Sequence, residues 1–177
     1  FKRFHYELGY DYRQYAGNKD RALSIPYFKA LAKRFAKDAT QASNWLDASQ
    51  YGNETDQLEA LRHFLQADPV NDPTRWYVAM NVAAKAKNGP LLVQAYQYLT
   101  KAEDQFGKSL SYFSNNYSSL IENGKKAEAD QYFARNKDLD PGSSELRKVA
   151  LLRIEELDDN AKARELDKLR KADNDQH

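Results

Sequence analysis

The three histidines are the side chains best suited to acid–base or metal chemistry, and none has a partner at a useful spacing. His5 lies two residues before Glu7, but residues two apart on a helix point in different directions and do not form a metal pair. His63 lies inside an apolar helical pattern, where a packing role is expected, and we expect His177 in a frayed tail. The histidines therefore predict neither a metal site nor a catalytic base.

Other residue patterns that carry catalysis are missing from the sequence. The chain contains no cysteine, which excludes disulfides, thiolate metal sites and cysteine nucleophiles. It has no glycine-rich phosphate loop and no nucleophile elbow. We therefore expect a protein without enzymatic activity, cofactor or metal. Its acidic pairs are adjacent in sequence, which is typical of solvated helix faces and caps: Glu103 with Asp104, Glu155 with Glu156, and Asp158 with Asp159.

The charge is balanced over the whole chain but not along it. The formal net charge is +1, yet residues 1–37 hold nine basic and three acidic side chains. This excess predicts either a hydrated outer helix face or a surface for an acidic partner, lipid headgroups or a polyanionic glycan. Tyrosines interleave with these basic residues, but core packing explains their spacing, so nucleic acid is not expected as a partner. The candidate basic patch consists of Lys29, Lys33, Arg34 and Lys37.

The composition favours helices over strands. Val and Ile together number eight and Thr four, whereas Ala numbers twenty-three. The 7 Gly and 5 Pro fall at breaks in the apolar pattern, except Gly9, which lies inside a predicted helix and should cost about 1 kcal/mol relative to Ala. The longest apolar runs, such as 149–152, are far shorter than the roughly 20 residues of a membrane helix. We therefore expect an all-α protein that does not span a membrane.

The spacing of apolar residues predicts about ten helices in five consecutive hairpins. Turn residues separate them: Gly17 with Asn18 ends the first, Ser24 caps the second, and Asp68 with Pro69 follows the fourth. Asp72 with Pro73 is a strong helix start, because proline at the first helical position loses no hydrogen bond. The predicted helices cover 1–15, 24–37, 40–51, 54–67, 73–87, 90–106, 109–122, 125–138, 144–157 and 161–172.

Some residues recur at a fixed period along the chain. Pro73, Gly107 and Pro141 are successively 34 residues apart. The same spacing separates three further pairs: Ala95 with Ala129, Leu99 with Phe133, and Asn81 with Asn115. A period of this length indicates a repeated helical hairpin.

The sequence here resembles the tetratricopeptide repeat family, whose unit is a helix–turn–helix of about 34 residues. The best segment, 110–141, has Gly124 at the turn, Ala129 and Phe133 on its second helix, and Leu139 and Pro141 at its end. It departs from the family pattern at Asn116, Tyr117 and Asn136. The resemblance implies a single α-solenoid domain, with a generic helical bundle as the alternative. Its parts are a basic N-terminal hairpin at 1–38, a degenerate repeat at 39–73, repeats at 74–107 and 108–141, a capping hairpin at 142–173 and a frayed tail at 174–177.

The resemblance also implies a concave groove lined by the first helix of each hairpin. Asn81 and Asn115, one repeat apart, would hydrogen-bond the backbone of an extended peptide there. The constellation with which chaperone-binding members clamp a terminal carboxylate is not reproduced, so a C-terminal carboxylate ligand is disfavoured. The predicted groove residues are Tyr77, Met80, Asn81, Ala84, Ser111, Ser114, Asn115 and Ser118.

These features favour a non-catalytic scaffold that binds a protein or peptide. Two alternatives remain: a structural or self-associating region of a larger envelope or secretion protein, with a homodimer through the terminal hairpins, and a helical accessory domain of an enzyme. The absence of cysteine, the start at Phe1 rather than Met and the abundance of Tyr, Asn, Gln and Ser favour a periplasmic or exported origin.

Overall fold

The structure is a computed structural model that describes residues 1–15, 20–67, 73–140 and 142–174. Within these ranges it contains ten α-helices, one 3₁₀ helix and no strand, which confirms the all-α prediction. No helix in these ranges is both long and apolar enough to span a bilayer. The elements are α1 (Lys2–Tyr15), η1 (Arg21–Ser24), α2 (Ile25–Arg34), α3 (Ala39–Ser49), α4 (Glu54–Gln66), α5 (Pro73–Lys85), α6 (Gly89–Phe106), α7 (Phe113–Glu122), α8 (Lys126–Asn136), α9 (Ser144–Glu155) and α10 (Asp159–Asn174).

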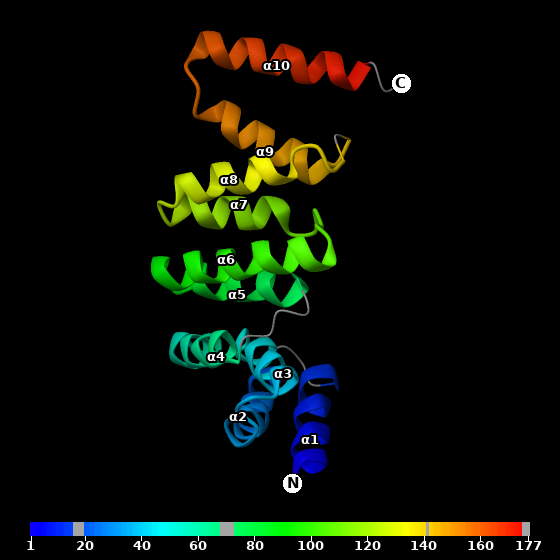
Figure 1. The fold of residues 1–177 in the computed structure, drawn as a ribbon, viewed down its shortest axis with the longest axis vertical. Helices are drawn as coiled ribbons and strands as arrows, with labels where there is room; N and C mark the ends of the chain where they lie inside the picture. The colour runs from blue at the N-terminus through cyan, green and yellow to red at the C-terminus, as the bar shows by residue number, and fades with distance from the viewer. Residues whose placement is uncertain (16–19, 68–72, 141, 175–177) are drawn as a thin grey trace.

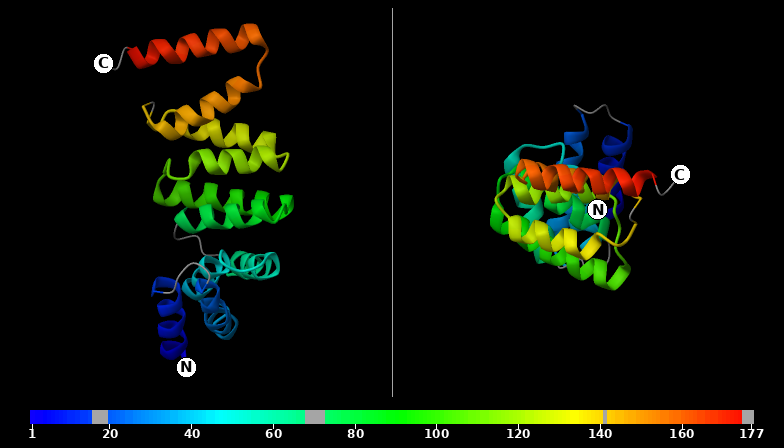
Figure 2. Two further views of the ribbon diagram at one scale, coloured as in Figure 1. Left: turned by 180° about the vertical axis from the view of Figure 1, so that it is seen from behind. Right: turned by 90° about the horizontal axis from the view of Figure 1, so that it is seen from above.

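The helices form an elongated stack with the two chain ends far apart (Figure 1). Helices α5 to α10 lie across the long axis, whereas α1 runs along it (Figures 1 and 2). Helix α5 packs against both α6 and α7, and α7 packs against both α8 and α9. Helix α3 in turn contacts α5, so alternate helices α3, α5, α7 and α9 touch in succession. Each of these four helices therefore packs both on the helix that follows it and on a helix two places away along the chain.

Side-chain caps fix several helix starts where the sequence pattern breaks. Asp38 accepts hydrogen bonds from the Thr40 and Gln41 backbone N–H groups at the start of α3. Asn53 caps α4 and Asn88 caps α6 in the same way, through their side-chain oxygens. These oxygens satisfy N–H groups that have no partner within the helix.

One predicted cap and three predicted helix boundaries differ from the structure. Ser24 lies at the N-terminal end of α2, but its side chain makes no capping hydrogen bond. Its hydroxyl donates to the Arg21 carbonyl at 2.7 Å. Helix α2 ends at Arg34 rather than at residue 37. Helix α7 begins at Phe113 rather than at residue 109, because Tyr112 adopts the left-handed region with φ of 64°. Helix α10 begins at Asp159, where the Asp158 carboxylate accepts from a backbone N–H.

Other predicted boundaries agree with the structure. Pro73 begins α5, as its position after Asp72 predicts, and Gly124 turns the chain between α7 and α8 with φ of 70°. A residue other than glycine is strained in that region, which explains why glycine occurs there. Several predicted stops and caps lie outside the described residues: Gly17, Asn18, Asp68, Pro69, Asp72, Pro141 and His177.

A continuous apolar core runs from α3 to α9. Trp76 of α5 is fully buried in it, with its ring centroid 4.7 Å from that of Tyr98 and 4.6 Å from that of Phe64. Ala95 and Ala129, one 34-residue period apart, are also fully buried. A second cluster around Phe28 and Trp45 joins α2 to α3 and α4. Small side chains such as these alanines let helix backbones approach one another. Large aromatic rings fill the remaining space between the helices.

The second cluster explains Gly9, which the sequence pattern leaves unexplained. A Cβ atom added at this position would lie 2.9 Å from Cε2 of the Phe28 ring, closer than carbon atoms approach in proteins. Phe28 has an exposed fraction of 0% and is held by the surrounding core, so the ring cannot move away freely. Glycine therefore lets α1 pack directly on an aromatic ring of α2.

Gly9→Ala should destabilise the protein by about 1–3 kcal/mol. Alanine is the better helix former, but the steric cost of placing its methyl group against the Phe28 ring exceeds the gain in helix propensity. Thermal unfolding followed by circular dichroism measures the change. The Phe28→Leu background is the control, since a smaller side chain makes room for the new methyl group. An equal cost of Gly9→Ala in both backgrounds would contradict the contact as its cause.

Candidate functional site

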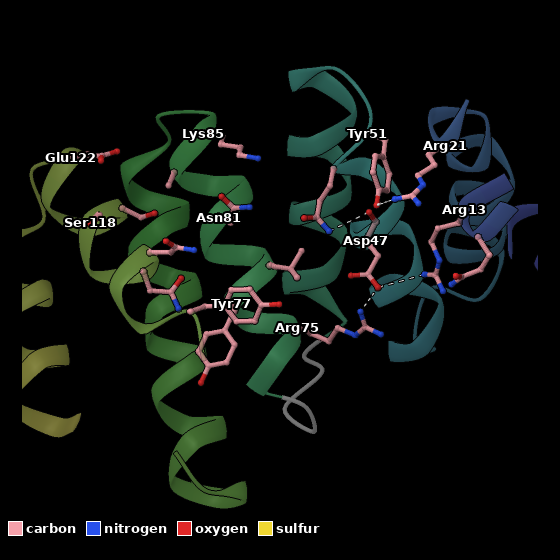
Figure 3. A pocket seen from close by; sticks show the side chains of 18 residues that line it. Arg13, Arg21, Asp47, Tyr51, Arg75, Tyr77, Asn81, Lys85, Ser118 and Glu122 are labelled. Atoms are coloured by element: carbon pink, nitrogen blue, oxygen red, sulfur yellow. Dashed lines mark hydrogen bonds and ion pairs between the residues drawn. The ribbon is translucent and has the colours of Figure 1, made fainter. Parts of the chain in front are cut away.

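A cavity of about 860 Å³, open to solvent, lies between the N-terminal helices and the central ones. One wall comes from α1, η1, α3 and the start of α5, and the other from the rest of α5 and from α7. Figure 3 shows the two walls facing each other. Polar side chains supply most of the lining, which includes Arg13, Arg21, Asp47, Tyr51, Arg75, Tyr77, Asn81, Lys85, Ser118 and Glu122.

Three arginines form the first wall, which we call the arginine wall: Arg13, Arg21 and Arg75. Arg75 hydrogen-bonds the Asp47 carboxylate, and Nη1 of Arg13 lies 3.6 Å from Oδ2 of the same group. Arg21 donates from Nη1 to the Tyr51 hydroxyl at 3.1 Å (Figure 3). The guanidinium groups come from three different elements, so only tertiary packing brings them together.

The arginines are held in place by more than one contact each. The Arg13 guanidinium lies 5.5 Å from the Phe28 ring centroid, and that of Arg21 lies 5.4 Å from the Tyr51 ring centroid. The Arg13 side chain is only 18% exposed. Cation–π contacts of this kind favour a fixed guanidinium over a mobile one. The wall is therefore partly desolvated, and contacts within the protein hold its guanidinium groups.

The second wall contains five of the eight predicted groove residues. Tyr77, Asn81 and Ala84 come from α5, and Asn115 and Ser118 come from α7. Asn115 is exposed and Asn81 is half-buried. The structure thus brings side chains from two helices, one 34-residue period apart, onto a single cavity. Their contact with a partner remains a prediction.

The other three predicted groove residues do not line the cavity. Met80 is fully buried in the core, and Ser114 is buried with its hydroxyl donating to Glu145 at 2.6 Å. Each directly precedes a lining asparagine, and one residue rotates a helix position by about 100°. Ser111 lies in the turn before α7, because that helix begins later than predicted. These three residues are therefore unavailable to a ligand in the cavity.

The predicted basic patch is partly neutralised. Lys29 and Lys33 of α2 both pair with Glu59 of α4, which holds the pKa of that carboxyl below its usual range. The Arg34 guanidinium lies over the Phe1 ring, with 4.8 Å to its centroid. Lys37 is exposed beyond the end of α2. Half of the patch therefore ties two helices together.

A buried carboxyl group contacts a residue of the second wall. Glu103 of α6 has an exposed fraction of 1%, and burial raises its pKa from 4.5 to about 7 against the opposing charge of Arg135. Oη of Tyr77 lies 3.4 Å from Glu103 Oε1 and donates to the Ser109 carbonyl at 3.1 Å. Burial and the Glu103 charge raise the pKa of Tyr77, so this hydroxyl stays protonated. The pair fixes the Tyr77 ring at the cavity.

Glu103→Gln should stabilise the protein at pH 8 by up to about 3 kcal/mol and change it little at pH 4. The folded state holds the Glu103 proton to about pH 7, whereas the unfolded chain releases it near 4.5, so the stability of the wild type falls as the pH rises between these values. Urea unfolding at a series of pH values measures the effect. Glu155→Gln, the same change at an exposed position of α9, is the control, and a pH dependence that survives Glu103→Gln would refute the assignment.

Within the described parts of the chain, no three His, Asp or Glu side chains gather closely enough to hold a metal ion. The cavity carries two carboxylates, from Asp47 and Glu122, on opposite walls. No protein-family model matches the sequence, and neither does any curated protein. The function must therefore be inferred from the helix arrangement and from the side chains of the cavity.

Proposed function

We propose that this protein is a non-catalytic interaction module that binds an extended peptide or protein segment in the cavity, on a tetratricopeptide-like α-solenoid. The observation that carries the proposal is that residues from two helices one 34-residue period apart line the same cavity. The succession of contacts between α3, α5, α7 and α9 supports it, because first helices of successive hairpins touch one another in such a solenoid.

The spacing of the two asparagines suits a peptide backbone. Packed helices lie about 8–10 Å apart, and an extended chain rises about 3.3 Å per residue. Asn81 on α5 and Asn115 on α7 would therefore meet peptide groups two to three residues apart along a bound segment. Each amide both donates and accepts, which matches the N–H and C=O of the backbone.

Asn81→Ala combined with Asn115→Ala should weaken peptide binding by about 10-fold or more, since each lost hydrogen bond contributes about 0.5–1.5 kcal/mol. The probes are peptides selected from a displayed random 12-residue library on the wild-type protein, with affinities measured by calorimetry. Thermal stability should hardly change, because neither side chain is part of the core.

Gln94→Ala combined with Asn160→Ala is the matched control, because both residues are exposed and lie outside the cavity. Equal affinities for the asparagine variant and the wild type would refute the cavity as the binding site. Failure to select any peptide would count against peptide binding altogether.

Exposed leucines favour self-association as a second candidate function. Leu151 on α9 is 41% exposed and Leu166 on α10 is 44% exposed, and Leu152 and Leu157 are exposed as well. Helix α10 packs against α9 at the C-terminal end of the stack (Figure 1), so it has a helix on one side only. A second copy covering this face would remove these side chains from water.

Light scattering should then give twice the chain mass of 20.4 kDa at high protein concentration, and Leu151→Asp with Leu166→Asp should restore the single mass. The charged side chains would be buried in the dimer, which is costly. Leu23→Asp at the other end of the stack, 50% exposed, is the control. A single chain mass at every concentration would exclude this candidate.

A further inference from the structure

We infer that the segment bound in the cavity is an acidic peptide whose side-chain carboxylates lie against the arginine wall. This inference rests on the proposed function and specifies its ligand. It assigns the acidic partner to the cavity rather than to Lys29 and Lys33 of α2, which already pair with Glu59.

The charge count of the arginine wall supports this assignment. Among the described residues that line this side of the cavity, three carry guanidinium groups and one, Asp47, carries a carboxylate, so these residues hold more positive than negative charge. On the opposite wall, Lys85 and Glu122 balance one another in number. The lining as a whole is therefore positive, although the chain carries a net charge of only +1. An anionic ligand would meet a favourable potential at this place.

The chemistry of arginine makes carboxylate the matching group. A guanidinium has five N–H donors in a planar fork that can bind a carboxylate through two parallel hydrogen bonds. The Arg13 side chain is 18% exposed and that of Arg75 is 33% exposed, so their charges are less screened by water than those of surface lysines. Asp47 holds Arg75, the Phe28 ring holds Arg13 and the Tyr51 ring holds Arg21. Groups held in position in this way lose less entropy on binding.

The two walls together define how the ligand would lie. Figure 3 shows Arg13, Arg21 and Arg75 on one side and Asn81 with Ser118 on the other. A peptide between them would turn its backbone towards the amides and its carboxylates towards the arginines. The inference commits to a peptide as the ligand, and binding of a nucleic acid is an outcome of the test below.

The test uses the full chain and the random 12-residue library described above. Selected peptides should be enriched in Asp and Glu over Lys and Arg. A synthetic copy of the best peptide with every Asp and Glu changed to Asn and Gln should bind at least 10-fold more weakly. Raising the salt concentration should weaken the binding of the acidic peptide and leave the binding of its neutral copy nearly unchanged.

Arg13→Gln combined with Arg21→Gln should lower the affinity for the acidic peptide at least 10-fold and hardly change that for the neutral copy. Arg3→Gln combined with Lys37→Gln, which removes the same charge at exposed positions outside the cavity, should bind like the wild type. Arg21→Gln alone, with Arg21 at the edge of the core, provides a milder variant if the double change lowers stability.

Four outcomes would overturn the inference. The selected peptides could show no enrichment in acidic residues and still bind more weakly to the Asn81→Ala, Asn115→Ala variant. That result would support the proposed function and refute the acidic ligand. An equal loss of affinity in the Arg13→Gln, Arg21→Gln variant and in the Arg3→Gln, Lys37→Gln variant would show a general effect of net charge instead. A single-stranded oligonucleotide of equal charge that binds as tightly, with the same dependence on Arg13 and Arg21, would replace the peptide as ligand. If no peptide is selected at all, the proposed function and the inference both fail.

Discussion

The packing of Trp76 between neighbouring helices is the interaction on which the candidate site depends. Its ring is fully buried, with Phe64 of α4 on one side and Tyr98 of α6 on the other. The N-terminal helices and the central helices each supply one wall of the cavity, so their relative position sets its width. Aromatic rings that bury about 150–250 Å² each fix such a position firmly. The polar cavity therefore lies beside an apolar contact that fixes α5, the helix that supplies residues to both walls.

Position along the stack decides how completely a helix can bury its side chains. Central helices have neighbours on two sides and contain buried polar groups such as Glu103, Asn116 and Asn136. Helix α10 packs against α9 and leaves Leu166 exposed. In a stack where each helix contacts mainly its neighbours, stability is approximately a sum of local contributions. The ends are therefore where further contacts would stabilise the protein most.

Cations of the same chain have different roles according to what faces them. Lys29 and Lys33 share Glu59 and join two helices, whereas Arg13 and Arg75 share Asp47 at the cavity. Among the described residues, the second group has the larger surplus of positive charge, because Arg21 adds a third guanidinium there. The uneven charge of residues 1–37 was visible in the sequence, but its division between a structural pair and a cavity wall was not.

The sequence by itself determined the helices and most of the turns, because apolar periodicity, caps and glycines act over a few neighbouring residues. Five of the residues that line the cavity were expected from the resemblance of the sequence to tetratricopeptide repeats. The sequence located Asn81 and Asn115 through their 34-residue spacing, but it could not tell that Met80 and Ser114 point into the core. Only the tertiary structure decided the arginine wall and the role of Gly9. Both depend on which distant helices become neighbours, and long-range packing rather than local spacing sets that choice.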